Sequence, residues 1–314
     1  SKEYTIELGE KLFKKLVLKD TADAFGRPTH TWTFENKKVG EYTEDADLTY
    51  TAGVKLGDIY SDLALTKTMA ANDVTFMLNG NTEANSGNDS KSVALTDTAL
   101  TKGYAGKIGN NGVLTQVWYD DDNGTALITM INTYVGKVSS VTKATSTADR
   151  YITITALPAL TGLDNKFETE DFAAKDMVSF TAARTGSGYE IQDVALLEKS
   201  VSGVMTAWTG NADTDSSANF TVDGTKYKYS AKKYVDSANK KVADFEVDES
   251  ELDVYLDQYG YALYIEGTTA EKKYAVVIGT GSTNAYGSET KGVTLLFPDG
   301  TQKEVTAKLT DGSA

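Results

Sequence analysis

Short runs in which apolar and polar residues alternate recur along the chain, separated by turn-forming residues. The pattern is densest over residues 111–138, where two runs rich in β-branched and aromatic side chains flank the turn sequence DDDNG at 120–124. Asn-Gly pairs accept the positive φ angles of tight turns between antiparallel strands. We therefore predict a β-hairpin, followed by a third strand over residues 134–141 in which Gly136 marks a bulge or a close backbone approach.

Helical periodicity is rare by comparison. Residues 58–65 carry apolar side chains at a spacing of three to four, which predicts one short helix capped by Asp58 or its neighbour. Residues 168–172 are predicted to start another helix, and residues 4–17 fit either a strand with a helical turn or one amphipathic helix interrupted by Gly9. The strands predicted from alternation cover residues 29–34, 48–54, 74–78, 150–155, 177–182, 189–197, 201–209, 252–257, 261–266, 275–278 and 293–297, and residues 219–229 predict a second hairpin around the turn Asp223-Gly224.

Short strands at regular spacing predict a mainly β fold of two or three consecutive small antiparallel domains, of sandwich or partly open barrel type, with a few short helices. A boundary could fall in the polar segment 79–92, which is predicted to be an exposed loop, but the glycine-rich stretch 103–112 is favoured. The predicted domains are an N-terminal one at 1–109, a central one at 110–199 and a C-terminal one at 200–314.

The composition excludes several kinds of site and partner. The 314 residues include no cysteine and one histidine, which excludes disulfides, thiolate catalysis and cysteine-ligated zinc. A net charge of −14 disfavours nucleic acid and anionic membrane surfaces as partners. No apolar run approaches the roughly 18 residues of a membrane-spanning helix, and the first residues do not open a signal peptide. We interpret the chain as a mature segment whose export signal or anchor lies outside it.

The acidic turn is the best candidate for a metal site. Asp120, Asp121 and Asp122 offer adjacent carboxylate oxygens to calcium, although the turn lacks the ligand spacing and terminal glutamate of an EF-hand loop. A solvated hairpin turn explains the same residues and is the favoured interpretation. For His30 we expect a hydrogen-bonded structural role rather than a metal ligand or general base, and for Gly279–Ser282 an ordinary loop rather than a phosphate-binding turn.

Aromatic residues give a second candidate chemistry, because Trp118, Trp208 and some of the 18 tyrosines could stack against sugar rings. Cross-strand packing is the favoured role for most of them, since alternating strands bury half of their side chains. The tyrosines that fit this packing are Tyr227, Tyr229, Tyr255, Tyr261 and Tyr264.

Three segments carry a family resemblance: residues 23–32, residues 117–124 together with 131–138, and residues 254–261. They resemble the extracellular region of S-layer homology domain-containing proteins from gut clostridia and related Firmicutes. The resemblance implies a secreted surface protein held to the cell wall by helical modules. We recognise no such module in these residues, so wall attachment is expected through modules outside this segment.

The expected function is therefore non-catalytic: surface assembly, display or adhesion, with copies of itself in a surface lattice or with cell-wall or host glycans as partners. The alternative is a secreted carbohydrate-binding module or adhesin that recognises glycans through exposed aromatic residues. A weaker alternative is the non-catalytic part of a wall hydrolase. No cofactor is expected apart from the calcium considered above.

Overall fold

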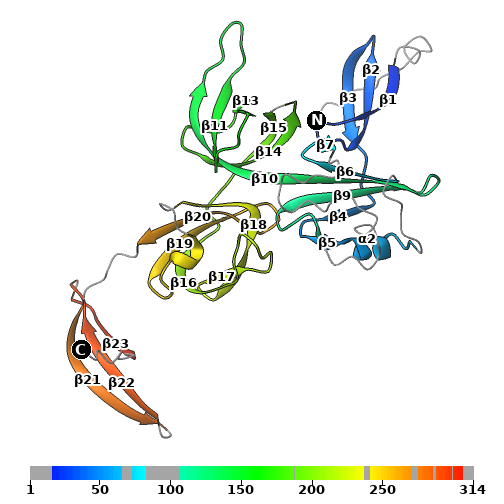
Figure 1. Ribbon diagram of the computed structural model, residues 1–314. Coiled ribbons are helices and arrows are strands. Elements are labelled where there is room, and N and C mark those ends of the chain that lie inside the picture. The colour runs from blue at the N-terminus through cyan, green and yellow to red at the C-terminus, as the bar shows by residue number, and fades with distance from the viewer. Residues whose placement is uncertain are drawn as a thin grey trace, which may run out of the picture. The chain divides into compact units, whose positions relative to one another are not determined.

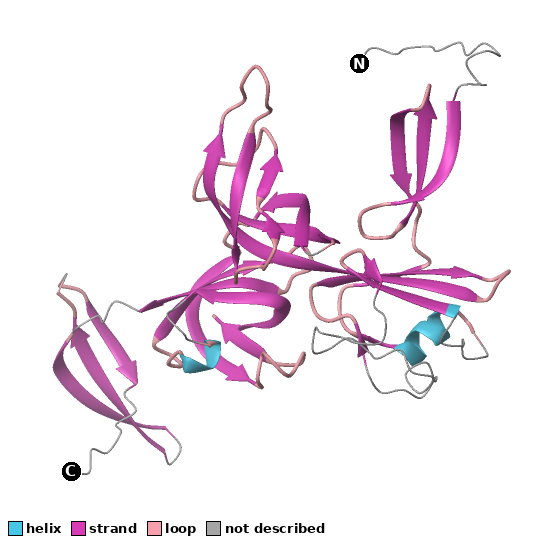
Figure 2. Ribbon diagram, turned by 45° about the horizontal axis from the view of Figure 1, so that its top comes forward, coloured by secondary structure: helices cyan, strands magenta, loops and turns pink. Residues whose placement is uncertain are grey.

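The computed structural model describes residues 16–65, 73–82, 107–186, 188–236, 241–269, 275–285, 288–298 and 300–306. The chain divides into two compact units between Thr268 and Thr269. The first unit contains an N-terminal three-stranded sheet, a large central sheet and a closed barrel, and the second contains another three-stranded sheet (Figure 1). Strands dominate both units (Figure 2), which confirms the predicted mainly β fold.

The N-terminal sheet is an antiparallel array of β1 (Leu16–Ala22), β2 (Pro28–Phe34) and β3 (Lys37–Thr43). Positive φ angles at Glu35 and Asn36 close the turn between β2 and β3. The register places Leu18, Trp32 and Gly40 side by side, and the next level on this face holds His30 and Tyr42. Leu18, Trp32 and Tyr42 are exposed, so this face carries apolar side chains at the surface. The prediction for residues 4–17 falls mainly on residues outside the described ones.

A single long strand organises the central sheet. β10 (Thr125–Thr142) has 18 residues, and its first half pairs with β9 (Val113–Asp120) and, in parallel, with β6 (Val74–Leu78). Its second half pairs with β11 (Tyr151–Leu157) and β14 (Met177–Thr185). The predicted hairpin is confirmed. The separate third strand is wrong, because the chain continues through Gly136 without leaving the sheet.

Gly136 lets three strands meet at this point. A Cβ atom there would lie 2.5 Å from Ile154 Cγ2, 3.0 Å from the Thr155 carbonyl oxygen and 3.2 Å from Phe180 Cε1. The close backbone approach predicted for this glycine is therefore confirmed. The bulge lies two residues further on, where the register with β11 shifts between Val138 and Ser140.

The N-terminal part of the chain contributes strands to this sheet, because β4 (Leu48–Tyr50) pairs with β9 and β7 (Asn81–Thr82) pairs with β6. The sheet therefore continues across residue 109, where the sequence suggested a domain boundary.

Asn79, expected in an exposed loop, is buried and donates from Nδ2 to the Tyr134 hydroxyl at 3.0 Å. The remaining strands of this part are β12 (Leu163–Asp164), β13 (Lys166–Glu168) and β15 (Gly188–Leu196) in the sheet, and the pair β5 (Val54–Lys55) and β8 (Lys107–Ile108) beside it.

Helix is confined to short elements in the described residues. α2 (Leu56–Asp62) confirms the predicted helix and buries Leu56, Ile59 and Tyr60 against the central sheet. Its N-cap is Lys55 and it has no side-chain cap, so capping by Asp58 is wrong; Asp58 lies in the first turn instead. The helix predicted to start at 168–172 is also wrong, because this segment ends β13 and continues as a loop.

The barrel consists of β16 (Val201–Thr209), β17 (Asn219–Val222), β18 (Thr225–Asp236), β19 (Ser250–Leu256) and β20 (Ala262–Thr269). The strand order is β16-β17-β18-β20-β19, and β18 pairs with β20 in parallel. A closed five-stranded barrel with order 1-2-3-5-4 and parallel third and fifth strands has the topology of the OB-fold. A short 3₁₀ helix, η2 (Val242–Asp244), lies between the third and fourth strands. The core includes Met205, Phe220 and Leu252.

The second unit is an antiparallel sheet of β21 (Val276–Ala285), β22 (Ser288–Leu296) and β23 (Gln302–Thr306), in that order. Gly279–Ser282 lies inside β21 and pairs with β22, so the loop predicted there is wrong. The phosphate-binding alternative has no turn to support it. Val276, Val277 and Ile278 on β21 are exposed.

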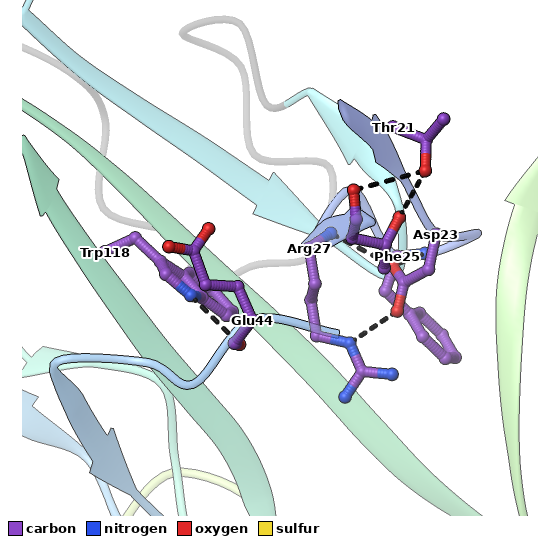
Figure 3. A network of polar contacts seen from close by, with 7 residues as sticks. Thr21, Asp23, Phe25, Arg27, Glu44 and Trp118 are labelled. Atoms are coloured by element: carbon purple, nitrogen blue, oxygen red, sulfur yellow. Dashed lines mark hydrogen bonds and ion pairs between the residues drawn. The ribbon is translucent and has the colours of Figure 1, made fainter. Parts of the chain in front are cut away.

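The turn between β1 and β2 joins the N-terminal sheet to the central sheet. The Asp23 carboxylate accepts hydrogen bonds from Phe25 N (2.9 Å), Arg27 N (3.0 Å) and Arg27 Nε (2.6 Å), which fixes the turn (Figure 3). The turn buries Phe25 against Ile131 and Ala183 of the central sheet. Phe25 is therefore an anchor that ties the first sheet to the second.

Candidate functional site

A cavity of about 440 Å³ lies on the barrel. It is formed by the end of β16, the loop between β16 and β17, the strand β18 and the segment that contains η2. Binding pockets for small ligands are typically of this size, with mostly apolar walls and a few polar groups. The residues that line the cavity are Pro158, Trp208, Gly210, Asn211, Ala212, Asp213, Tyr229, Lys233, Tyr234, Val235, Lys241, Val242 and Ala243.

Aromatic rings form one side of this cavity, which we call the Trp208 cavity. Trp208 is 41% exposed at the end of β16, next to the loop that begins at Gly210. Tyr229 packs on Phe220 with ring centroids 4.9 Å apart, and burial raises its pKa. Tyr234 stacks almost parallel to Tyr264, at 6.3 Å and 7°. The two tyrosines are thus held by the barrel, whereas the indole is available to a ligand.

Three charged side chains also line the Trp208 cavity in the described part of the chain: Asp213, Lys233 and Lys241. Asp213 Oδ1 lies 3.0 Å from Lys233 Nζ, and its Oδ2 lies 3.1 Å from Lys241 Nζ. These hydrogen bonds, the one from Lys233 first, lower the pKa of Asp213, so the carboxylate is ionised at neutral pH. Lys233 also donates to the Ala212 carbonyl oxygen at 3.1 Å and lies over the Tyr229 ring. Its ammonium therefore braces the loop against the barrel wall.

A smaller polar cavity of about 140 Å³ shares part of this wall. Asp213, Tyr229 and Lys233 line both cavities, so the two adjoin. Ser230 is buried in the wall of the small cavity, and its hydroxyl bonds to the Asp257 carboxyl. The small cavity also holds Asn110, Asp215 and Ser216, so it offers a polar extension of the aromatic one.

Ser230 also belongs to the contact between the barrel and the central sheet. Asn111 donates from Nδ2 to the Ser216 carbonyl oxygen at 2.7 Å and accepts from the Ala231 amide at 2.8 Å. Gly112, with φ +71°, lies against Ser230 Oγ and Asp257 Oδ2, and these two oxygens would block any side chain there. Asp257 Oδ1 accepts from the amides of Tyr259 and Tyr261, and the carboxyl also bonds to the Ser230 hydroxyl. Burial raises the pKa of this carboxyl.

We expect Asp257→Asn to increase the free energy of unfolding at pH 7 by about 1 kcal/mol, because it removes a charge whose desolvation raises the pKa of this buried carboxyl and keeps an oxygen that the Tyr259 and Tyr261 amides can bond. An acid whose pKa is raised on folding stabilises the fold fully below its unfolded pKa, near 4, and loses this contribution as pH rises through the folded value. Urea unfolding at a series of pH values from 4 to 7 should show a smaller loss of stability in the variant. Asp253→Asn is the control, because Asp253 is ion-paired to Lys199 at 3.1 Å. Equal gains in both variants would contradict the assignment.

The predicted calcium turn lies at the surface. The carboxylates of Asp120, Asp121 and Asp122 come within 4.8 Å of one another, and all three residues are exposed. Asp120 accepts from Asn123 Nδ2 at 2.7 Å and from its amide at 3.0 Å, which lowers the pKa of Asp120. Calcium takes roughly six to eight oxygen ligands, so these carboxylates could supply only part of a site. The calcium interpretation stays a prediction.

One acidic cavity was not expected from the sequence. It has a volume of about 730 Å³ beside the same hairpin, and Trp118 and Thr75 form part of its wall. Its acidic residues come from segments far apart in the chain, so only the folded sheet brings them together. They are Glu44, Asp45, Asp47, Asp73 and Asp120.

His30, Trp118 and most of the tyrosines considered in the sequence contact other side chains or the backbone of the fold. His30 Nδ1 lies 2.9 Å from Asp20 Oδ1 and its ring lies 4.8 Å from that of Tyr42, which fits the hydrogen-bonded role expected. Trp118 is only 9% exposed and donates to the Glu44 carbonyl oxygen at 3.3 Å (Figure 3), so it is part of the core. Of the two tryptophans singled out in the sequence, only Trp208 is exposed. Cross-strand aromatic packing is observed for Tyr227, Tyr229, Tyr255 and Tyr264.

Comparison with protein-family models, with curated proteins and with solved structures finds no match to this chain. The resemblance to extracellular regions of S-layer homology domain-containing proteins therefore stays a prediction. Among the described residues, no helix has both the length and the apolar character required to cross a membrane.

Proposed function

We propose that this chain is a non-catalytic, extracellular segment of a bacterial surface protein that binds glycan in the Trp208 cavity. The observation that carries the proposal is an exposed indole at a cavity of about 440 Å³ whose wall also holds an ion-paired Lys-Asp-Lys group. A sugar ring presents apolar C–H faces and polar hydroxyl edges. The aromatic side of the cavity suits the faces, and the charged groups suit the hydroxyls.

The topology of the barrel supports this assignment by analogy. OB-folds bind oligosaccharides or oligonucleotides on the face of strands 2 and 3 and in adjacent loops. The Trp208 cavity uses the third strand, β18, and the loop between the first and second strands. The charge of −14 favours a saccharide over a nucleic acid, because a nucleic-acid backbone needs clustered Lys and Arg, whereas the described lining of the cavity holds two lysines, both ion-paired to Asp213. Fold analogy supplies only the class of ligand, and the residues of the cavity supply the site.

Trp208→Ala is expected to abolish binding to glycans that the unmodified chain retains on a glycan array, with a loss of affinity of at least tenfold in solution. Removing the indole removes the stacking surface but little of the barrel core, because Trp208 is 41% exposed. Trp32→Ala is the matched control, since Trp32 is 36% exposed on the N-terminal sheet. Saturable binding that is retained in Trp208→Ala would contradict the proposal for this site.

Self-assembly is a second candidate function, favoured by apolar side chains on the surface of both three-stranded sheets. Leu18, Trp32 and Tyr42 are exposed on one face of the N-terminal sheet, and Val276 and Val277 are exposed on β21. Exposed apolar patches of this kind mark protein interfaces. Sedimentation velocity over a concentration series, with millimolar calcium and then with chelator, distinguishes the candidates. A monomer in both conditions leaves only the glycan proposal.

A further inference from the structure

The charges in the wall of the Trp208 cavity differ in sign from those of the chain as a whole. Lys233, Lys241 and Asp213 are the charged residues of its described lining, which therefore carries two positive charges and one negative charge, a net charge of +1. The chain carries a net charge of −14. Binding of a neutral sugar does not require an excess of positive charge. An anionic ligand does require it, because the acidic surface of the rest of the chain would repel that ligand. The cavity is thus a locally cationic place on an acidic protein.

The two lysines have different roles. The Lys233 side chain is 15% exposed and contacts Asp213, the Ala212 carbonyl oxygen and the face of Tyr229, so it holds the wall together. The Lys241 side chain is 66% exposed, and Asp213 holds its ammonium 3.1 Å away at the cavity wall. A ligand in the cavity can therefore reach Lys241 without breaking the support that Lys233 gives.

We infer that the ligand is an acidic oligosaccharide, with a uronate-type carboxylate placed at Lys241 and a sugar ring on Trp208. This inference rests on the proposed function and specifies its ligand class. A carboxylate on a sugar ring next to the indole can meet the exposed ammonium of Lys241, and charge-assisted hydrogen bonds are stronger than those between neutral groups.

The adjoining polar cavity extends the site and gives the ligand a direction. Its lining includes Asn110, Asp215 and Ser216. Polar groups of this kind can exchange hydrogen bonds with a second sugar unit. Asp215 makes this end unfavourable for a carboxylate, so the acidic unit lies on the Trp208 side and a neutral unit or neutral edge lies toward Asn110 and Ser216.

Isothermal titration with uronate oligosaccharides derived from pectin and hyaluronan, each compared with its methyl ester, tests the inference. The ester keeps the rings and hydroxyls but removes the charge. We expect the unmodified chain to bind an acid form at least tenfold more tightly than its ester, and this preference should decrease as sodium chloride is added. Lys241→Gln should abolish the preference while binding of the ester is retained, and Lys241→Arg should keep most of it.

The outcomes separate this inference from the proposed function. If acids and esters bind equally and Trp208→Ala abolishes both, the cavity is a site for neutral sugar and the inference is overturned while the function stands. If no saccharide, acidic or neutral, binds in a manner that depends on Trp208, the proposed function itself fails. An acid preference that survives Lys241→Gln would place the carboxylate elsewhere and overturn the inference.

Discussion

Replacing Gly136 by valine is expected to destabilise the central sheet, with a loss of about 3 kcal/mol in the free energy of unfolding. Strand glycines are normally improved by a β-branched side chain, because valine favours extended backbone. Here a Cβ would lie 3.0 Å from the Thr155 carbonyl oxygen and 2.5 Å from Ile154 Cγ2, and backbone on the neighbouring strand cannot move without breaking its pairing. Steric overlap therefore outweighs propensity.

Gly40→Val is the matched control for this prediction. Gly40 also lies in a strand, β3, but the nearest atoms to a Cβ there are those of Trp32 at 4.0 Å, which is ordinary contact. Urea unfolding followed by the fluorescence of the buried Trp118 reports on the central sheet. Similar unfolding midpoints for the two variants would contradict the close packing at Gly136.

Phe25→Ala is expected to release the N-terminal sheet from the central sheet, at a cost of about 3 to 5 kcal/mol to that contact. Phe25 packs against Ile131 and Ala183 and supports the Arg27 guanidinium 5.5 Å above its ring. The central sheet has its own core, in which Phe180 and Ile154 are fully buried, so it should remain folded. The expected result is local opening rather than global unfolding.

Hydrogen exchange resolved by peptide measures this opening directly. Amides of β2 should exchange faster in Phe25→Ala, while those of β10 and β14 keep their protection. Val39→Ala, an exposed position in the same sheet, should change neither. Loss of protection in β10 as well would show that the two sheets fold as one cooperative unit.

Local patterns predicted most strands because each strand here is short and alternates. The Asp-Gly turn at 223–224 is an example: both residues adopt positive φ, and β17 and β18 pair on either side of it. The helix α2 was found for the same reason, since its buried residues follow helical spacing. Its cap was not found, because Lys55 lies at that position with extended backbone and no side-chain hydrogen bond.

Pairing between strands that are far apart in the chain could not be predicted from the sequence. β6 pairs with β10 in parallel across about 50 residues, and no local pattern records that choice. The close approach at Gly136 was predicted, but the sequence did not show that residues 134–141 continue the preceding strand as part of β10. The order of strands in the barrel is set in the same way, by the parallel pairing of β18 with β20.

From the sequence we predicted that an aromatic side chain could bind sugar, but not where the site lies or which charged residues line it. Trp208 was singled out among the aromatic residues, and the structure places it at a cavity. Trp118 was equally plausible from its sequence but is covered by the segment around Glu44. Asp213, Lys233 and Lys241 carry no motif, because a loop and two other segments converge only after the barrel closes. Two lysines that lie 20 or more residues after an aspartate in the sequence do not predict a binding site.

The continuity of β10 also determines how the central sheet would carry mechanical load. An extended strand of 18 residues spans roughly 60 Å and is hydrogen-bonded along its length, to β6 and β9 in its first half and to β11 and β14 in its second. Tension along this strand would load its ladders in shear, so many hydrogen bonds would have to break together rather than one at a time. In the surface role proposed above, this strand would transmit tension between the two halves of the sheet.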